Sequence, residues 1–197
     1  YEECRPYTLI HVERMYSLYK AVQYIVKKGV QGDFVECGVW KGGAAMMMAK
    51  TLLSMGVRDR KIYLYDTYEG MTMPTAEDKS IVRGAQPVMD IWNREKANDH
   101  NNWCYGPLEG VKSVMESTGY PSENIVYVKG PVEETLPKVM PGNIALLRLD
   151  TDWYSSTKHE MEHLFPSLVQ NGVLILDDYG YWAGARQAAD EYLAQHI

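Results

Sequence analysis

The sequence has few cysteines and no long apolar run. Its three cysteines, Cys4, Cys37 and Cys104, are odd in number and widely spaced, which fits neither a disulfide framework nor a zinc knuckle. A reducing compartment, the cytoplasm, is therefore the expected location. No apolar run approaches the ~20 residues of a membrane helix, and the N-terminus lacks the basic and apolar regions of a signal peptide. We expect no contact with a membrane.

The sequence also lacks an excess of positive charge and lacks a linker. Its net charge of −6 argues against a nucleic-acid surface, because phosphate binding needs clustered Lys and Arg. No Pro/Gly/Ser-rich stretch divides the chain, so residues 1–197 are expected to form a single domain. Fifteen tyrosines against two phenylalanines indicate half-buried aromatic side chains that can line a polar cleft.

Short apolar runs alternate with helical segments five times along the chain. Such alternation predicts an α/β fold with a doubly wound, Rossmann-like parallel sheet. We expect the strand order 3-2-1-4-5, which makes the first and fourth strands neighbours at the switch point. The expected strands are 33–37, 61–66, 124–129, 144–150 and 173–178; the expected helices include 12–28, 108–117, 133–137, 156–169 and 183–195.

Two segments lie outside this regular pattern. Residues 1–30 form an N-terminal helical segment, because apolar side chains recur there at three- and four-residue spacing. Residues 67–107 have little periodicity, yet contain Trp92, Trp103 and Tyr105. Disordered segments are poor in aromatics, so we expect this insertion to be a partly helical lid over the active edge of the sheet.

A glycine loop follows the first expected strand, as in nucleotide-type sites. It does not match the dinucleotide pattern GxGxxG. Glu36, at the end of that strand, would repel a pyrophosphate but could face an ammonium group, which favours S-adenosylmethionine over a nicotinamide cofactor. Asp66 ends the second strand and can accept ribose hydroxyls, or alternatively cap the next turn. The candidate cofactor-binding residues are Glu36, Gly38, Trp40, Gly42, Gly43 and Asp66.

Four aspartates follow the fourth and fifth strands, where parallel sheets bind ligands. They are Asp150, Asp152, Asp177 and Asp178. Like charges at one sheet edge raise each other's pKa unless a cation lies between them. Magnesium takes carboxylate oxygens readily, so this edge is a candidate Mg²⁺ site.

Residues 159–163 read HEMEH, which is the HExxH signature of zinc peptidases. On a helix, Met161 and Leu164 share an apolar face while His159 and His163 project from the opposite one. Pro166 also disturbs the helix soon afterwards. These patterns favour a solvated helix face, with a zinc peptidase as the alternative.

Four motifs resemble the macrocin O-methyltransferase family: residues 36–43, 65–71, 149–157 and 177–180. Members of this family depend on S-adenosylmethionine and magnesium and methylate sugar hydroxyls of natural products. The resemblance implies that Asp150, Asp177 and Asp178 hold magnesium and that Asp152 is the general base. It also implies that Glu36, the loop 38–43 and Asp66 bind the cofactor, and that a sugar or glycoside is the acceptor.

The sequence departs from the family pattern in two ways. Ala44 stands where many relatives carry a small hydroxyl residue. The antiparallel sixth and seventh strands of a methyltransferase sheet do not follow within these residues, so we expect either a longer natural chain or a partner chain, as in a homodimer, covering the edge of the fifth strand. These departures leave open a second hypothesis, a cofactor-binding module without catalysis.

Overall fold

A computed structural model describes residues 1–82 and 87–196. Its centre is a five-stranded sheet with the order β3-β2-β1-β4-β5, and every neighbouring pair is parallel. The predicted fold class and strand order are therefore confirmed. The strands are β1 Asp33–Cys37, β2 Ile62–Asp66, β3 Ile125–Lys129, β4 Ile144–Leu149 and β5 Leu168–Leu176.

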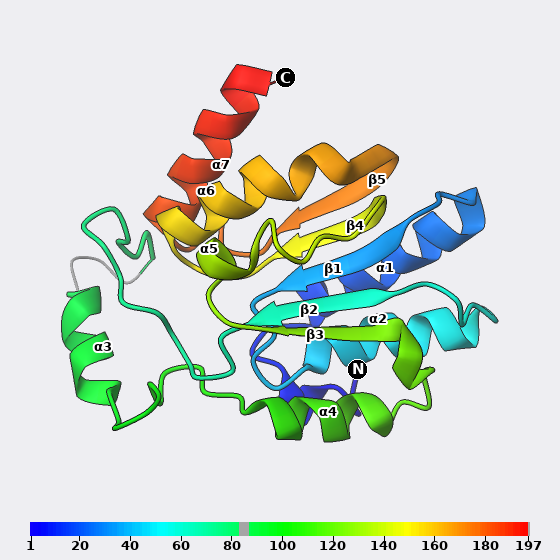
Figure 1. The fold of residues 1–197 in the computed structure, drawn as a ribbon, viewed down its shortest axis with the longest axis horizontal. Helices are drawn as coiled ribbons and strands as arrows, with labels where there is room; N and C mark the ends of the chain where they lie inside the picture. The colour runs from blue at the N-terminus through cyan, green and yellow to red at the C-terminus, as the bar shows by residue number, and fades with distance from the viewer. Residues whose placement is uncertain (83–86, 197) are drawn as a thin grey trace.

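Helices cover both faces of this sheet (Figure 1). One face carries α1 Val12–Lys28, α2 Gly43–Ser54 and α4 Leu108–Glu116, and the other carries α5 Val132–Thr135, α6 Tyr154–His163 and α7 Ala183–His196. Short 3₁₀ helices span Arg5–Tyr7, Ser122–Asn124 and Phe165–Ser167. No helix in the described part combines the length and apolar character needed to cross a membrane.

Side-chain alternation along the strands builds two separate cores. Phe34 and Leu146 are fully buried in the core on the α1 and α2 side, whereas Val35 and Leu147 are buried in the core on the α6 side. Because both faces are covered, β1 and β4 are mostly apolar rather than alternating, and Asp33, Glu36 and Arg148 are their charged residues. This explains why they were readable as buried strands from sequence.

The boundary between α6 and β5 differs from the sequence expectation. The helix ends at His163 rather than near Val169, and the strand begins at Leu168 rather than Val173. Pro166 has no N–H to donate and cannot continue an α-helix. The chain therefore passes through the 3₁₀ turn Phe165–Ser167 and enters the sheet early.

The loops that follow β1 and β4 are in direct contact. Asp150 N donates to Cys37 O at 2.9 Å. Gly38 has φ +82°, and a Cβ on it would lie 1.9 Å from Asp150 O. Only glycine tolerates both the positive φ and the approach, so Gly38 fixes the distance between the glycine loop and the first aspartate.

The segment 67–107 lies beyond the carboxyl ends of the strands and contains α3 Val88–Glu95 (Figure 1). Residues 83–86 of this expected insertion lie outside the described residues. Asp78, only 2% exposed, accepts a hydrogen bond from Tyr154 N at 2.7 Å. Trp153 Nε1 donates to Thr72 O at 3.0 Å. The segment is therefore docked onto the start of α6.

Candidate active site

A cavity of about 430 Å³ opens at the carboxyl edge of the sheet. Its walls come from the segments that follow each of the five strands, from the segment 67–107 and from residues 7–14. Two predicted residues, Gly42 and Gly43, are not among its lining: Gly42 faces Val111, and Gly43 packs against Tyr7 O. The predicted residues that line it are Glu36, Gly38, Trp40, Asp66, Asp150, Asp152, Asp177 and Asp178.

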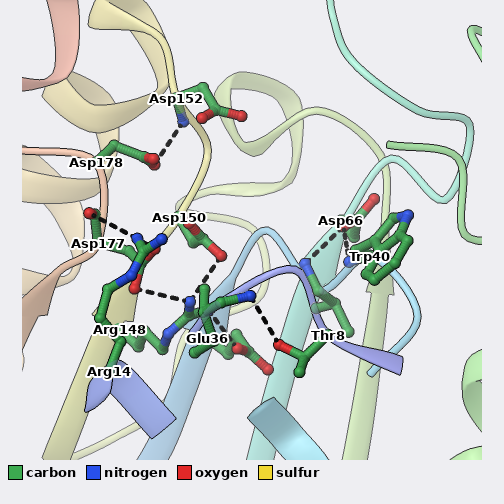
Figure 2. Close-up of polar contacts among 12 residues, drawn as sticks. Thr8, Arg14, Glu36, Trp40, Asp66, Arg148, Asp150, Asp152, Asp177 and Asp178 are labelled. Atoms are coloured by element: carbon green, nitrogen blue, oxygen red, sulfur yellow. Dashed lines mark hydrogen bonds and ion pairs between the residues drawn. The ribbon is translucent and has the colours of Figure 1, made fainter. Parts of the chain in front are cut away.

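A buried arginine, which the sequence analysis passed over, lies at the centre of this edge (Figure 2). Arg148 is 2% exposed, and its guanidinium contacts Glu36 Oε1 at 2.6 Å, Asp150 Oδ2 at 2.8 Å and Asp177 Oδ1 at 3.1 Å. Burial lowers the pKa of Arg148, but the three carboxylates outweigh it and raise the pKa overall. The sequence signal that could have identified Arg148 was a charged residue inside an otherwise apolar strand.

A second arginine reaches the same cluster from α1. Arg14 Nη1 forms an ion pair with Asp177 Oδ2 and donates to Asp177 O at 3.4 Å. The Arg14 side chain is 45% exposed, whereas that of Asp177 is 4% exposed. Two guanidinium groups therefore offset part of the repulsion within the cluster, a role that the sequence analysis gave to a metal ion alone.

Three of the aspartates still meet the requirements of a cation site. Oxygen atoms of Asp150, Asp177 and Asp178 lie within 4.8 Å of one another. Burial raises the pKa of Asp150 and of Asp178 well above the usual range, and nearby aspartates add to the shift, although Arg148 opposes it at Asp150. A convergent set of hard oxygen donors whose charge is only partly balanced is suited to Mg²⁺.

Asp152 lies beside this set in a strained backbone conformation. Its φ is +68°, which a non-glycine residue rarely adopts. Asp152 N donates to Asp178 Oδ2 at 3.1 Å, which holds the turn in place (Figure 2). Burial, followed by the charge of Asp150, raises the pKa of Asp152 to about 7, and Trp182 donates a hydrogen bond to its carboxylate. A carboxylate with this pKa can accept a proton near neutral pH.

Glu36 has one carboxylate oxygen without a partner. The side chain is fully buried, Oε1 is paired with Arg148, and Oε2 has no hydrogen-bond partner among the described residues. Burial raises the pKa of Glu36 to about 7, against the opposing charge of Arg148. Buried polar atoms in proteins are nearly always satisfied, so a lone acceptor lining the cavity points to a cationic or hydrogen-bonding ligand.

Asp66 acts as a cap on the glycine loop. Its Oδ2 accepts from Val39 N at 2.6 Å and from Trp40 N at 3.1 Å, and its Oδ1 accepts from Tyr68 N at 2.7 Å. The structure therefore contains the capping interaction that the sequence left as an alternative to ribose binding. Because a carboxylate has about four acceptor sites, these bonds leave little capacity for a further partner.

Three tryptophans form a wall beside Asp152. Trp103, from the segment 67–107, lies 5.7 Å from Trp153 and 6.1 Å from Trp182 between ring centroids, and Trp153 and Trp182 are 5.1 Å apart. Trp103 and Trp182 line the cavity. This cluster joins residues distant in sequence, so sequence periodicity gave no sign of it.

The HExxH motif does not have the arrangement of a peptidase site. Its glutamate, Glu160, is fully buried and accepts a hydrogen bond from Thr151 Oγ1 at 3.1 Å, whereas His159 and His163 are half-buried. Burial raises the pKa of Glu160 well above the usual range. A general base turned into the core cannot activate a metal-bound water beside the histidines.

Comparisons with known proteins agree with this geometry. The sequence matches the family described as Macrocin-O-methyltransferase (TylF) over residues 4–197. The 8-demethyl-8-(2,3-dimethoxy-alpha-L-rhamnosyl)-tetracenomycin-C 4'-O-methyltransferase of Streptomyces olivaceus is 31% identical, with 96% of this chain and 69% of the relative covered. The demethyldecarbamoylnovobiocin O-methyltransferase of Streptomyces niveus is 29% identical over 96% of this chain and 68% of the relative.

A solved structure shows the same fold. The O-methyltransferase NovP superposes with a TM-score of 0.81 at 28% identity, covering 96% of this chain and 74% of its own. The fold implies the use of S-adenosylmethionine, and the zinc-peptidase alternative is set aside. On the family match, the relatives and the shared fold, this chain belongs to the macrocin O-methyltransferase family and is a methyltransferase.

Proposed function

We propose that this protein is an S-adenosylmethionine- and Mg²⁺-dependent O-methyltransferase that acts on a sugar hydroxyl of a glycosylated small molecule. The observation that carries the proposal is the convergence of Asp150, Asp177 and Asp178, with oxygens within 4.8 Å, in the same cavity as Glu36. Each group by itself has another explanation. Together at the switch point of a methyltransferase fold, they form a metal site beside a cofactor site.

The cofactor half of the site is assigned to Glu36 and the glycine loop. S-adenosylmethionine supplies a methyl group activated by its positive sulfur. The unpartnered Glu36 Oε2 would accept the ammonium of the methionine moiety, which would satisfy a buried acceptor. Gly38 and Trp40 would form the adjoining wall, and Asp66 would hold the loop in shape while any ribose contact uses its remaining acceptor capacity.

The metal half is assigned to the three aspartates. Mg²⁺ would orient acceptor oxygens and lower the pKa of the reacting hydroxyl. Asp150, Asp177 and Asp178 would supply its carboxylate ligands. Arg148 would continue to neutralise part of their negative charge through its ion pairs with Asp150 and Asp177. Arg14 reaches Asp177 from a partly exposed position, so it can withdraw from that oxygen when a cation binds.

Asp152 is assigned as the general base. Asp152 lines the same cavity as the three aspartates, and its backbone N–H is bonded to Asp178 Oδ2. It would take the proton from the acceptor hydroxyl as the oxygen attacks the methyl group, a role typically worth about 10²–10⁴-fold in rate. The pKa near 7 suits this proton transfer.

A sugar acceptor is supported by the relatives and by the tryptophan wall. The names of two relatives specify a rhamnosyl-tetracenomycin 4'-O position and a mycinamicin III 3''-O position. Trp103 and Trp182 present large amphipathic rings in the cavity, a surface against which an apolar sugar face can pack. Residues 67–107 would act as the lid that excludes water in a single methyltransferase domain, 1–197. In the described residues β5 pairs only with β4, and a homodimer is one way to cover its free edge.

A panel of glycosides tests the activity and the acceptor class together. The full chain is incubated with S-adenosylmethionine, Mg²⁺ and each glycoside, and methylated product is detected by mass spectrometry. We expect product with at least one glycoside, and its complete loss when a chelator removes divalent metal. Full activity in excess chelator would remove the metal from the proposal. Tight S-adenosylmethionine binding by calorimetry without product from any acceptor would support a binding module instead.

A further inference from the structure

Three side chains of α6 that the proposed mechanism does not use form a compact cluster, whereas Glu160 of the same helix is fully buried. His159 and His163 lie one helical turn apart, with ring centroids 4.1 Å apart and planes tilted by 31°. Potential ligand atoms of His159, Glu162 and His163 lie within 4.8 Å of one another. The two histidines are half-buried and Glu162 is exposed, so the cluster is accessible to an ion from solvent.

Backbone carbonyls hold both imidazole rings in position. His159 Nε2 donates to Leu136 O at 3.2 Å, and His163 Nδ1 donates to His159 O at 2.9 Å. A carbonyl can only accept, so in the neutral rings these nitrogens carry the protons and the lone pairs are on His159 Nδ1 and His163 Nε2. Metal-binding histidines characteristically donate their second ring N–H to a backbone carbonyl or carboxylate in this way.

The donor set selects a different class of ion from that expected at the aspartates. Two imidazole nitrogens and one carboxylate oxygen suit Zn²⁺ and its neighbours in the first transition row, whereas Mg²⁺ prefers oxygen ligands. Three protein ligands with a water in the fourth position are the arrangement of catalytic zinc sites. Glu160 faces the core, so a zinc ion at this place would lack the general base of the motif.

We propose that His159, Glu162 and His163 form a zinc-binding site that is separate from the active site. His159 would link the ion to the chain at Leu136, immediately after α5, because the same ring donates to that carbonyl. The bound ion would therefore fasten α6 to the connection between α5 and β4. This inference does not depend on the proposed substrate or on the magnesium site.

Metal titration of the full chain tests the proposal. The protein is stripped of metal and kept in millimolar Mg²⁺, so that the aspartates are occupied, and is then titrated with Co²⁺ followed by Zn²⁺. We expect one equivalent of Co²⁺ with the visible absorption of a tetrahedral site, displaced by Zn²⁺, and an increase in Tm with Zn²⁺. His163→Gln and His159→Gln should each weaken Zn²⁺ binding at least 10-fold, while Asp177→Asn should bind Zn²⁺ like the unaltered protein.

The outcomes separate this site from the proposed function. Zn²⁺ binding that persists undiminished in both histidine variants, or that disappears in Asp177→Asn, would overturn the inference. If Zn²⁺ bound at millimolar concentration only, it would be an adventitious ion only, and the inference would be overturned as well. Circular dichroism checks that both variants are folded. Methyl transfer by His163→Gln should equal that of the unaltered protein, so failure of the zinc site leaves the methyltransferase assignment intact.

Discussion

Replacing Gly38 by alanine should disable the site through a single methyl group. Two effects act together at this position. The first is the φ of +82°, which costs a residue with a Cβ about 1–2 kcal/mol. The second is steric, because the new Cβ would lie 1.9 Å from Asp150 O, where ordinary contact begins at 3.4 Å. The loop after β4 must therefore move by roughly 1 Å or more, carrying Asp150 away from its partners.

The expected functional loss follows from that displacement. Misplacing a reacting group by about 1 Å can lower the rate by about 10²-fold. We expect Gly38→Ala to lose about 10²-fold in kcat and to bind Mg²⁺ and S-adenosylmethionine more weakly. Its free energy of unfolding, measured with urea, should fall by at least the cost of placing a Cβ residue at positive φ.

Gly56→Ala is the matched control. Gly56 has a similar φ of +76°, and a Cβ on it would meet nothing within 4 Å. The free energy of unfolding of this variant should fall by the same cost of a positive φ, but its ligand affinities and kcat should be unaltered. If both variants retained normal Mg²⁺ and cofactor affinity and normal rate, the contact between the two loops would not control the geometry of the site, and the reasoning would be refuted.

Two further perturbations probe the charges of the site. Asp152→Asn should lower kcat by about 10²–10⁴-fold and leave the S-adenosylmethionine affinity, measured by calorimetry, unchanged; normal turnover by this variant would exclude the base role. The raised pKa of about 7 leaves Asp152 protonated at lower pH, so kcat/KM of the unaltered enzyme should rise with pH through that region. Arg148→Met leaves Glu36 buried without its cation and should lower the free energy of unfolding by about 3–5 kcal/mol. Its control, Lys112→Met at the exposed pair with Glu109, should lower it by at most about 1 kcal/mol. Equal losses for the two variants in urea unfolding would contradict the argument that burial makes the Arg148 pair important.

The sequence by itself determined the architecture of this protein. Runs such as 33–37 and 144–149 are mostly apolar because both faces of a parallel sheet are covered, with Asp33, Glu36 and Arg148 as the exceptions. Their alternation with helices leaves few topologies. The carboxylates that follow the strands are necessarily at the carboxyl edge. The strand order and the positions of Asp150 and Asp177 were therefore predictable from local pattern and handedness. His159 and His163, expected on a solvated face, are instead half-buried.

Tertiary structure alone decided how the charges at that edge are balanced. Arg14, Glu36, Arg148 and Asp177 come from three strands or strand ends and one helix, and no spacing along the chain encodes their distances. From the sequence, a metal ion was the only expected positive partner of the aspartates. The burial of Arg148 and its ion pairs could not be predicted, because they depend on the register of β1 with β4. The same holds for Glu160 and the tryptophan wall: burial and contact are properties of packing between distant segments, and only the folded chain fixes them.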